Sequence, residues 1–229
     1  MRRNRHISTA VRLSAIRSQA DGHKLRAMGG FMSSKHGFLL VLSTIFFVTS
    51  GLLESIDLPS SSWATAQENR SLAPYVPTPQ DVVDRMLTLA GVTEKDTVYD
   101  LGCGDGRIVI TAASRFGARG VGIDFDPQRI AESNANAARA NVEHLVKFIE
   151  QDAMEVDVSE ATVVTLYLLS SSNAKLRPIL TRQLRPDSRI VSHAFSMGDW
   201  TPDTIDRFED ARGNTRTLYL WRHDGTVRD

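Results

Sequence analysis

The sequence predicts an α/β fold: a Rossmann-like, seven-stranded and mostly parallel sheet with helices on both faces and an antiparallel C-terminal edge hairpin. Three observations predict it. Strand-like and helix-like runs alternate between residues 96 and 195, which indicates a parallel sheet covered on both faces. The run TVVTLYLL (162–169) is apolar almost throughout, as in strands buried on both faces. Two further strand-like runs flank EDARGN (209–214), which predicts the hairpin.

The elements are expected in a regular order. β-Branched and aromatic content predicts strands at 96–102, 120–126, 146–152, 162–169 and 188–195, and hairpin strands at 203–208 and 215–222. Apolar spacing and alanine content predict helices at 107–117, 127–141 and 173–184. Pro127 suits a first helical position, whereas Pro178 should kink or restart the third of these helices.

A further amphipathic helix is expected before the first strand, within APYVPTPQDVVDRML (73–87). Thr78 is predicted to cap it, with Pro79 in the first turn. Its apolar positions are expected to face the core: Val82, Val83, Met86 and Leu87.

The chain divides into zones: a basic disordered leader (1–36), a hydrophobic segment (37–53), a linker (54–72) and a globular domain (73–224). Residues 1–35 carry eight Lys or Arg and one acid, so the remainder of this neutral chain is net −7. An acidic domain gives no support to a nucleic-acid partner, which would need cations against phosphates. Because Cys103 is the only cysteine, neither an intrachain disulfide nor a Cys-based zinc site can form, and no metal site is predicted.

The hydrophobic segment, GFLLVLSTIFFVTSGLL (37–53), contains no charge and has the length of a short membrane span or a long signal sequence. It predicts either a membrane anchor or export, with cleavage after Ala66 in the pattern Ala-Thr-Ala. Translation from Met28 or Met32 would give an ordinary export signal, and translation from Met1 an Arg- and Ser-bearing stretch like an organelle transit peptide.

Three glycines in five positions follow the first predicted strand in VYDLGCGDGRIVITAA (98–113): Gly102, Gly104 and Gly106. Glycines at the carboxyl end of such a strand let a ligand approach the backbone, next to the N-terminus of the following helix. A dinucleotide fingerprint would require a third glycine at position 107, which is Arg. A nicotinamide-dependent oxidoreductase is therefore disfavoured.

Acidic residues end three successive predicted strands. Asp100 would repel a pyrophosphate and suits a ligand with an ammonium or sulfonium charge, and Asp124 is placed to accept both hydroxyls of a ribose. Asp126 is expected to cap the next helix, and Asp152, which ends the third strand, could equally be a turn or cap residue. The D-x-G-x-G-x-G pattern resembles class I S-adenosylmethionine-dependent methyltransferases. This resemblance implies that Asp152 holds the adenine amino group.

A second resemblance narrows the family. PYVPTP (74–79), DLGCGDGRIVI (100–110) and RIVSHAFSMGDWTPD (189–203) resemble membrane-associated protein-lysine methyltransferases that modify the adenine nucleotide translocase and the ATP synthase c-ring protein. The likeness covers about 150 residues, and the segment 37–53 is similar to that family's membrane anchor. It implies a lysine of a membrane-associated protein as acceptor, and Tyr75 and Thr78 folded over the methionine end of the cofactor.

The chain departs from that family in two places. Asp124 is followed by FDPQ where relatives tend to have Glu and then Asn-Pro, and SSSNAKL (170–176) stands where relatives tend to have a proline. The second departure borders the expected acceptor pocket. A small-molecule or lipid methyltransferase, and a non-catalytic module that binds S-adenosylmethionine, therefore stay open as alternatives.

No catalytic residue is assigned, because displacement at a sulfonium methyl needs alignment and exclusion of water more than a base. LYLL (166–169) also replaces the Asn/Asp-Pro-Pro-aromatic motif of enzymes that methylate adenine N6 or glutamine amides. Tyr167, His193 and Trp200 are candidate pocket walls without a catalytic role, and Cys103 is expected to be a small residue in a tight loop.

Overall fold

The computed structural model describes residues 72–229. The predicted leader, hydrophobic segment and linker up to residue 71 lie outside the described residues. Between residues 72 and 229, no helix is both long and apolar enough to cross a membrane.

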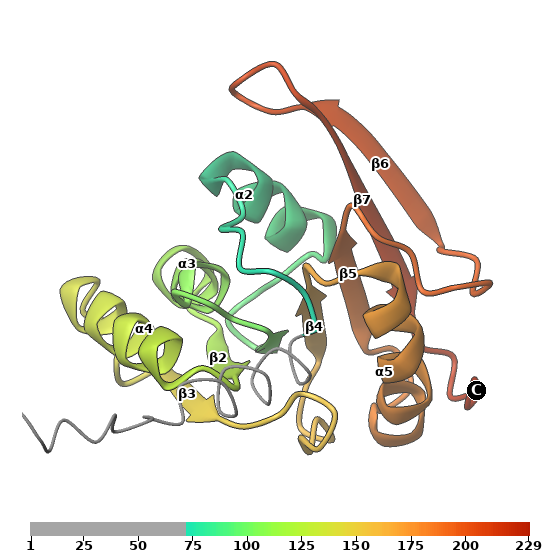
Figure 1. The fold of residues 1–229 in the computed structure, drawn as a ribbon, viewed down its shortest axis with the longest axis horizontal. Helices are drawn as coiled ribbons and strands as arrows, with labels where there is room; N and C mark the ends of the chain where they lie inside the picture. Colours follow the sequence, from blue (N-terminus) through green and yellow to red (C-terminus); the bar gives the residue numbers. More distant parts are fainter. Residues whose placement is uncertain (1–71) are drawn as a thin grey trace, which may run out of the picture. The chain divides into compact units, whose positions relative to one another are not determined.

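From residue 72 onward the chain forms one seven-stranded sheet in the order β3-β2-β1-β4-β5-β7-β6 (Figure 1). The strands β1 to β5 run parallel, and β7 pairs antiparallel with both β5 and β6. The predicted parallel sheet with an antiparallel hairpin at its edge is therefore confirmed. The strands are β1 (Thr97–Leu101), β2 (Arg119–Asp124), β3 (Val146–Glu150), β4 (Val163–Leu166), β5 (Arg189–His193), β6 (Thr204–Glu209) and β7 (Thr215–Arg222).

Helices cover both faces of the sheet. On one face lie α2 (Gln80–Leu89), α3 (Arg107–Phe116) and α4 (Pro127–Arg139), and α5 (Ser170–Gln183) lies on the other (Figure 1). The central strand β4 is buried along its whole length, as predicted, because both faces are packed. Val163 packs in the cluster that contains α2 and α3, whereas Leu166 packs in the cluster that contains α5.

Local signals explain most helix starts. The predicted inward face of α2 is confirmed, since Val82, Val83, Met86 and Leu87 are fully buried. Asp126 caps α4 as predicted, accepting a hydrogen bond from the Gln128 N–H at 2.8 Å. Thr78 does not cap α2: Pro79 occupies the N-cap position and no side chain caps the helix.

Two other boundaries differ from the prediction. The helix α5 begins at Ser170, three residues early, and continues through Pro178 without restarting. The strand β5 ends at His193 and not at residue 195, because Ala194 turns the backbone to a φ of 66°.

Candidate active site

The glycine turn after β1 is fixed against the end of β2. The N–H groups of Gly102 and Cys103 both donate to the Ile123 carbonyl, at 2.8 and 2.9 Å. Gly102 and Gly104 have φ values of 81° and 54°, which favour glycine. A side chain at Gly104 would overlap the ring of Tyr75, so this glycine is needed for close approach as well as for conformation.

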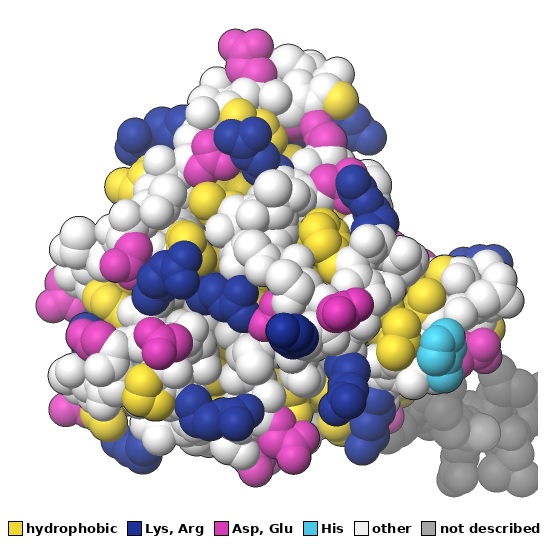
Figure 2. All heavy atoms as spheres, turned by 180° about the vertical axis from the view of Figure 1, so that it is seen from behind, with side chains coloured by type: hydrophobic (Ala, Val, Ile, Leu, Met, Phe, Trp, Pro, Cys, Tyr) yellow, Lys and Arg dark blue, Asp and Glu magenta, His cyan; other side chains and the backbone are white. Residues whose placement is uncertain are grey.

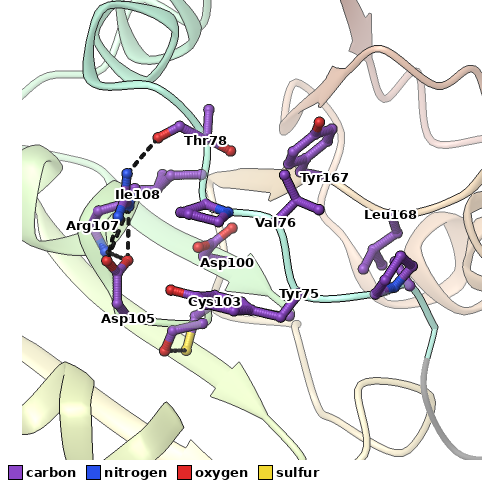
Figure 3. Close-up of a pocket in the computed structure, with 15 residues that line it drawn as sticks. Tyr75, Val76, Thr78, Asp100, Cys103, Asp105, Arg107, Ile108, Tyr167 and Leu168 are labelled. Atoms are coloured by element: carbon purple, nitrogen blue, oxygen red, sulfur yellow. Dashed lines mark hydrogen bonds and ion pairs between the residues drawn. The ribbon is translucent and has the colours of Figure 1, made fainter. Parts of the chain in front are cut away.

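Two adjoining hollows open beside this turn, and Figure 3 shows the first. The first brings together five predicted site residues: Tyr75, Thr78, Asp100, Gly102 and Gly104. The second contains the other two acids and shares Gly102: Asp124 and Asp152. Gly106 lines neither hollow; it begins α3, where a side chain would collide with Phe148 and Ser133 at 2.7–2.8 Å.

Asp100 lies at the floor of the first hollow with only 3% of its surface exposed. The Thr165 hydroxyl donates to its Oδ1 at 2.7 Å. Burial, which the Thr165 hydrogen bond only partly offsets, raises the pKa of Asp100 to about 7, and the neighbouring Asp124 and Asp105 raise it further. A buried carboxylate with one hydroxyl partner and acidic neighbours is an environment that a cation would stabilise.

Asp124 ends β2 and holds the glycine turn. Its Oδ2 accepts from the Gly104 N–H at 2.9 Å, and its Oδ1 accepts from the Asp126 N–H at 3.0 Å. Burial raises the pKa of Asp124, although these two backbone hydrogen bonds act against the shift. A carboxylate offers about four acceptor positions, so each oxygen can still accept a hydroxyl.

Asp152 follows β3 and adopts the turn geometry that its sequence context allowed. Its Oδ1 accepts from the Met154 N–H at 2.9 Å. The side chain nevertheless lines the second hollow with Ala153 and Asp124, so the three acids lie along one edge of the sheet, as the topology predicted.

Residues 72–78, here called the strap, cross the mouth of both hollows. At one end the Ser172 hydroxyl donates to the Leu72 carbonyl at 2.5 Å. At the other end Arg107 Nη1 donates to the Thr78 carbonyl at 2.7 Å. The strap is thus fastened to α5 and to α3.

The middle of the strap rests on the glycine turn through Tyr75. Its ring packs on Gly104, and the guanidinium of Arg129 lies 4.6 Å from the ring centroid, within range of a cation–π interaction. The hollows measure about 60 and 40 Å³, well below the ~300 Å³ or more of a typical ligand site. A nucleoside that spans both therefore requires the strap to shift.

Asp105 and Arg107 are site residues that sequence reasoning missed. Arg107 Nε donates to Asp105 at 2.8 Å, and the Arg107 N–H at the start of α3 also donates to Asp105 at 3.3 Å. This carboxylate occupies the helix N-terminus that a pyrophosphate would need. The geometry therefore also disfavours a dinucleotide. A pairing of residues two apart was visible in the sequence, but its link to Thr78 was not.

The remaining candidates divide clearly. Tyr167 lines the first hollow, and His193 is buried against it with ring centroids 4.0 Å apart. Trp200 lines neither hollow; it packs against Trp221 in the core. Burial raises the pKa of Cys103 far above its usual range, and the nearby Asp100 adds to the shift, so this thiol is not a nucleophile.

Substitution of Gly104 by Ala is expected to destabilise the fold more than the same change at Gly213. Both glycines have positive φ, but a side chain at Gly213 meets nothing within 4 Å. The backbone cost of about 1–2 kcal/mol is shared, and overlap with Tyr75 should add about 1–3 kcal/mol at Gly104 alone. Urea unfolding measures both variants. The excess should disappear when Tyr75 is also replaced by Ala; if it persists, Tyr75 does not rest on this glycine.

Comparison with known proteins agrees on the class of enzyme. Residues 100–204 match the family described as the ANTKMT methyltransferase domain. A protein-lysine N-methyltransferase of Saccharolobus islandicus is 46% identical over 149 residues, which are 65% of this chain and 92% of that protein. A human lysine N-methyltransferase of the ATP synthase c-ring protein is 26% identical over 178 residues, 78% of this chain and 73% of that protein.

A solved structure gives the same fold with a ligand. It is described as an RNA methyltransferase from Salinibacter ruber in complex with S-adenosyl-L-homocysteine. It is 54% identical, covers 67% of this chain and 97% of its own, and superposes with a TM-score of 0.63. The cofactor of this chain is accordingly S-adenosylmethionine, as predicted.

The residues of the two hollows fit that cofactor. Gly104 forms a backbone cradle that any side chain would fill, and Asp100 is a buried acid suited to a cation. Asp124 has free acceptor capacity for hydroxyls beside it. The chain is an S-adenosylmethionine-dependent methyltransferase, and it belongs to the protein-lysine N-methyltransferase family that carries the ANTKMT methyltransferase domain.

Proposed function

We propose that this enzyme transfers a methyl group to the side-chain amine of a lysine, on a protein located at a membrane. The observation that carries the lysine acceptor is the 46% identity to a protein-lysine N-methyltransferase over nearly all of that relative. The membrane location rests on the charge-free segment 37–53 and on the name of the human relative, which acts on a component of ATP synthase.

The predicted site residues would divide the work of binding. Asp124 and Asp152 would hold the nucleoside through its ribose and adenine, and Asp100 would face the cationic methionine end. Tyr75 and Thr78 of the strap would cover that end and exclude water. When bound, S-adenosylmethionine supplies a methyl whose bond to sulfur breaks as the bond to nitrogen forms, leaving a neutral thioether.

The acceptor amine must be unprotonated to react. Transfer of a lysine from water into a partly apolar cleft lowers its pKa, so its proton can leave to solvent before the reaction. The methylated amine then carries a positive charge, which it loses as a proton before any further methylation. The chain therefore needs to orient the amine and keep water away, and no dedicated base is required.

RNA is the competing acceptor, because the 54% identical structure is described as an RNA methyltransferase. Two observations favour protein. The LYLL stretch (166–169) replaces the motif expected of enzymes that methylate adenine N6. Figure 2 shows one face of the domain, on which basic and acidic side chains are interspersed and no continuous basic surface is formed.

The proposal is tested by incubating the full-length protein and tritium-labelled S-adenosylmethionine with membrane proteins, soluble proteins, lipids and total RNA in separate reactions. Label in methyl-lysine after acid hydrolysis of membrane proteins is the expected result. Asp124→Ala is the control and should transfer none. Label in methyl-lysine of soluble proteins alone would overturn the membrane location, and label confined to RNA or lipid would overturn the lysine acceptor.

A further inference from the structure

Three aromatic rings form a stack beside the first hollow. Tyr167 directly follows β4 and His193 ends β5, so two neighbouring parallel strands bring them together. The ring centroids of Tyr167 and His193 lie 4.0 Å apart, and those of Tyr167 and Phe195 lie 6.3 Å apart with planes inclined by 29°. Tyr167 lines the hollow that contains Asp100, and Phe195 is partly exposed.

A strained turn places Phe195 in this stack. Ala194 has a φ of 66°, although it is not glycine, and the Phe195 N–H donates to the His193 carbonyl at 2.9 Å. A three-residue turn of this kind, with a positive φ at its centre, is rare and strained. Strain of this kind persists where the surroundings enforce it, and it concentrates at functional sites.

Two buried polar residues enforce the turn. The Ser192 hydroxyl donates to the Phe195 carbonyl at 2.7 Å. The Asn173 amide on α5 donates to the Ser192 hydroxyl and to the Phe195 carbonyl, both at 3.1 Å. Both Asn173 and Ser192 are fully buried, so this network is part of the domain core and not an accident of a surface loop.

The stack is suited to a cationic guest because it carries no charge of its own at neutral pH. Burial lowers the pKa of His193 to about 4, with a further contribution from Arg216 and an opposing one from Asp210. His193 is 1% exposed, and within residues 72–229 its Nδ1 has no hydrogen-bond partner. The imidazole thus serves as a neutral ring behind Tyr167.

We propose that Tyr167 and Phe195 are the specificity-determining wall for the acceptor side chain, and that Asn173 and Ser192 are positioning residues that hold Phe195 there. This inference rests on the proposed lysine acceptor. The methylene stem of a lysine would lie along the ring faces, and each added methyl would strengthen the contact of the cationic nitrogen with them. Val76 of the strap lies beside Tyr167 at the same end of the hollow (Figure 3).

The wall should therefore govern how strongly the acceptor binds and how many methyl groups it receives. Phe195→Leu keeps an apolar side chain but removes the aromatic face. It is expected to raise the KM for an acceptor peptide, taken from the labelled protein, about tenfold with little change in kcat for the first methyl. Calorimetry with the trimethyl-lysine form of that peptide, in the presence of S-adenosyl-L-homocysteine, should show binding weakened about tenfold.

Matched variants separate this role from stability. Phe208→Leu makes the same change on β6 and should leave KM and methylation state unchanged. Ser192→Ala should shift KM in the same direction as Phe195→Leu, and Ala194→Gly, which suits the positive φ, should not. All four variants should bind S-adenosyl-L-homocysteine as the unmodified protein does.

The outcomes keep the two proposals distinct. If the unmodified enzyme produces no methyl-lysine, the proposed function fails and this inference fails with it. If it produces methyl-lysine while Phe195→Leu leaves KM, trimethyl-lysine binding and the distribution of methylation states unchanged, the aromatic wall alone is wrong.

Discussion

Asp124→Ala is expected to weaken S-adenosylmethionine binding about 100-fold or more. Its two oxygens are placed to accept ribose hydroxyls while they hold the N–H groups of Gly104 and Asp126. Hydrogen bonds to a charged group contribute about 1.5–3 kcal/mol each, and about 2.8 kcal/mol corresponds to 100-fold in affinity. Isothermal titration calorimetry with cofactor measures the change directly.

Asp126→Ala is the matched control for that experiment. It removes an acid two residues away and costs about 1 kcal/mol of stability through loss of the α4 cap. Its affinity for the cofactor should stay within a factor of two or three. Equal affinities in the two variants would remove Asp124 from the binding site.

Asp100→Asn is expected to abolish a pH dependence of cofactor binding. The carboxylate of Asp100, with a pKa of about 7, must be ionised to attract the cationic end of the cofactor. The apparent affinity of the unmodified protein should therefore fall about tenfold from pH 8 to pH 6, one tenfold step for each unit below the pKa. In Asp100→Asn, binding at pH 8 should be at least tenfold weaker and nearly flat over this range.

The same residue should affect the ligand-free fold in the opposite direction. The pKa of Asp100 is raised above the unfolded value of about 3.9, so protonation stabilises the fold, and this stability is lost as pH rises from about 4 through 7. Asp100→Asn should therefore unfold at a higher temperature than the unmodified protein at pH 8, measured by calorimetry without cofactor. A variant that binds normally at pH 8 would contradict the role of Asp100.

The sheet and its three terminal acids could be predicted because they depend on local pattern and on one topological rule. Apolar runs indicate strands, and parallel strands place their carboxyl ends together, so Asp100, Asp124 and Asp152 had to share an edge. Boundaries were less certain. Ala194 ends β5 early through a backbone conformation that alanine does not signal.

The contacts that close the site could not be predicted, because they join residues far apart in the sequence. Arg107 reaches the Thr78 carbonyl across 29 positions, and Ser172 reaches Leu72 across 100. In the sequence, Thr78 has the features of a helix cap, and only the packed structure shows its carbonyl engaged by Arg107. Asn173 likewise has no local feature that connects it to Phe195.

The fastening of the strap at both ends has a consequence for the order of events in turnover. Val76 and Tyr75 lie over the nucleotide hollow and also border the wall beside Tyr167. An acceptor docked against that wall would press on the same residues that must lift for the nucleoside to pass. The donor therefore enters before the acceptor, and the spent nucleoside departs last, which makes it an inhibitor that competes with fresh donor rather than with the protein substrate.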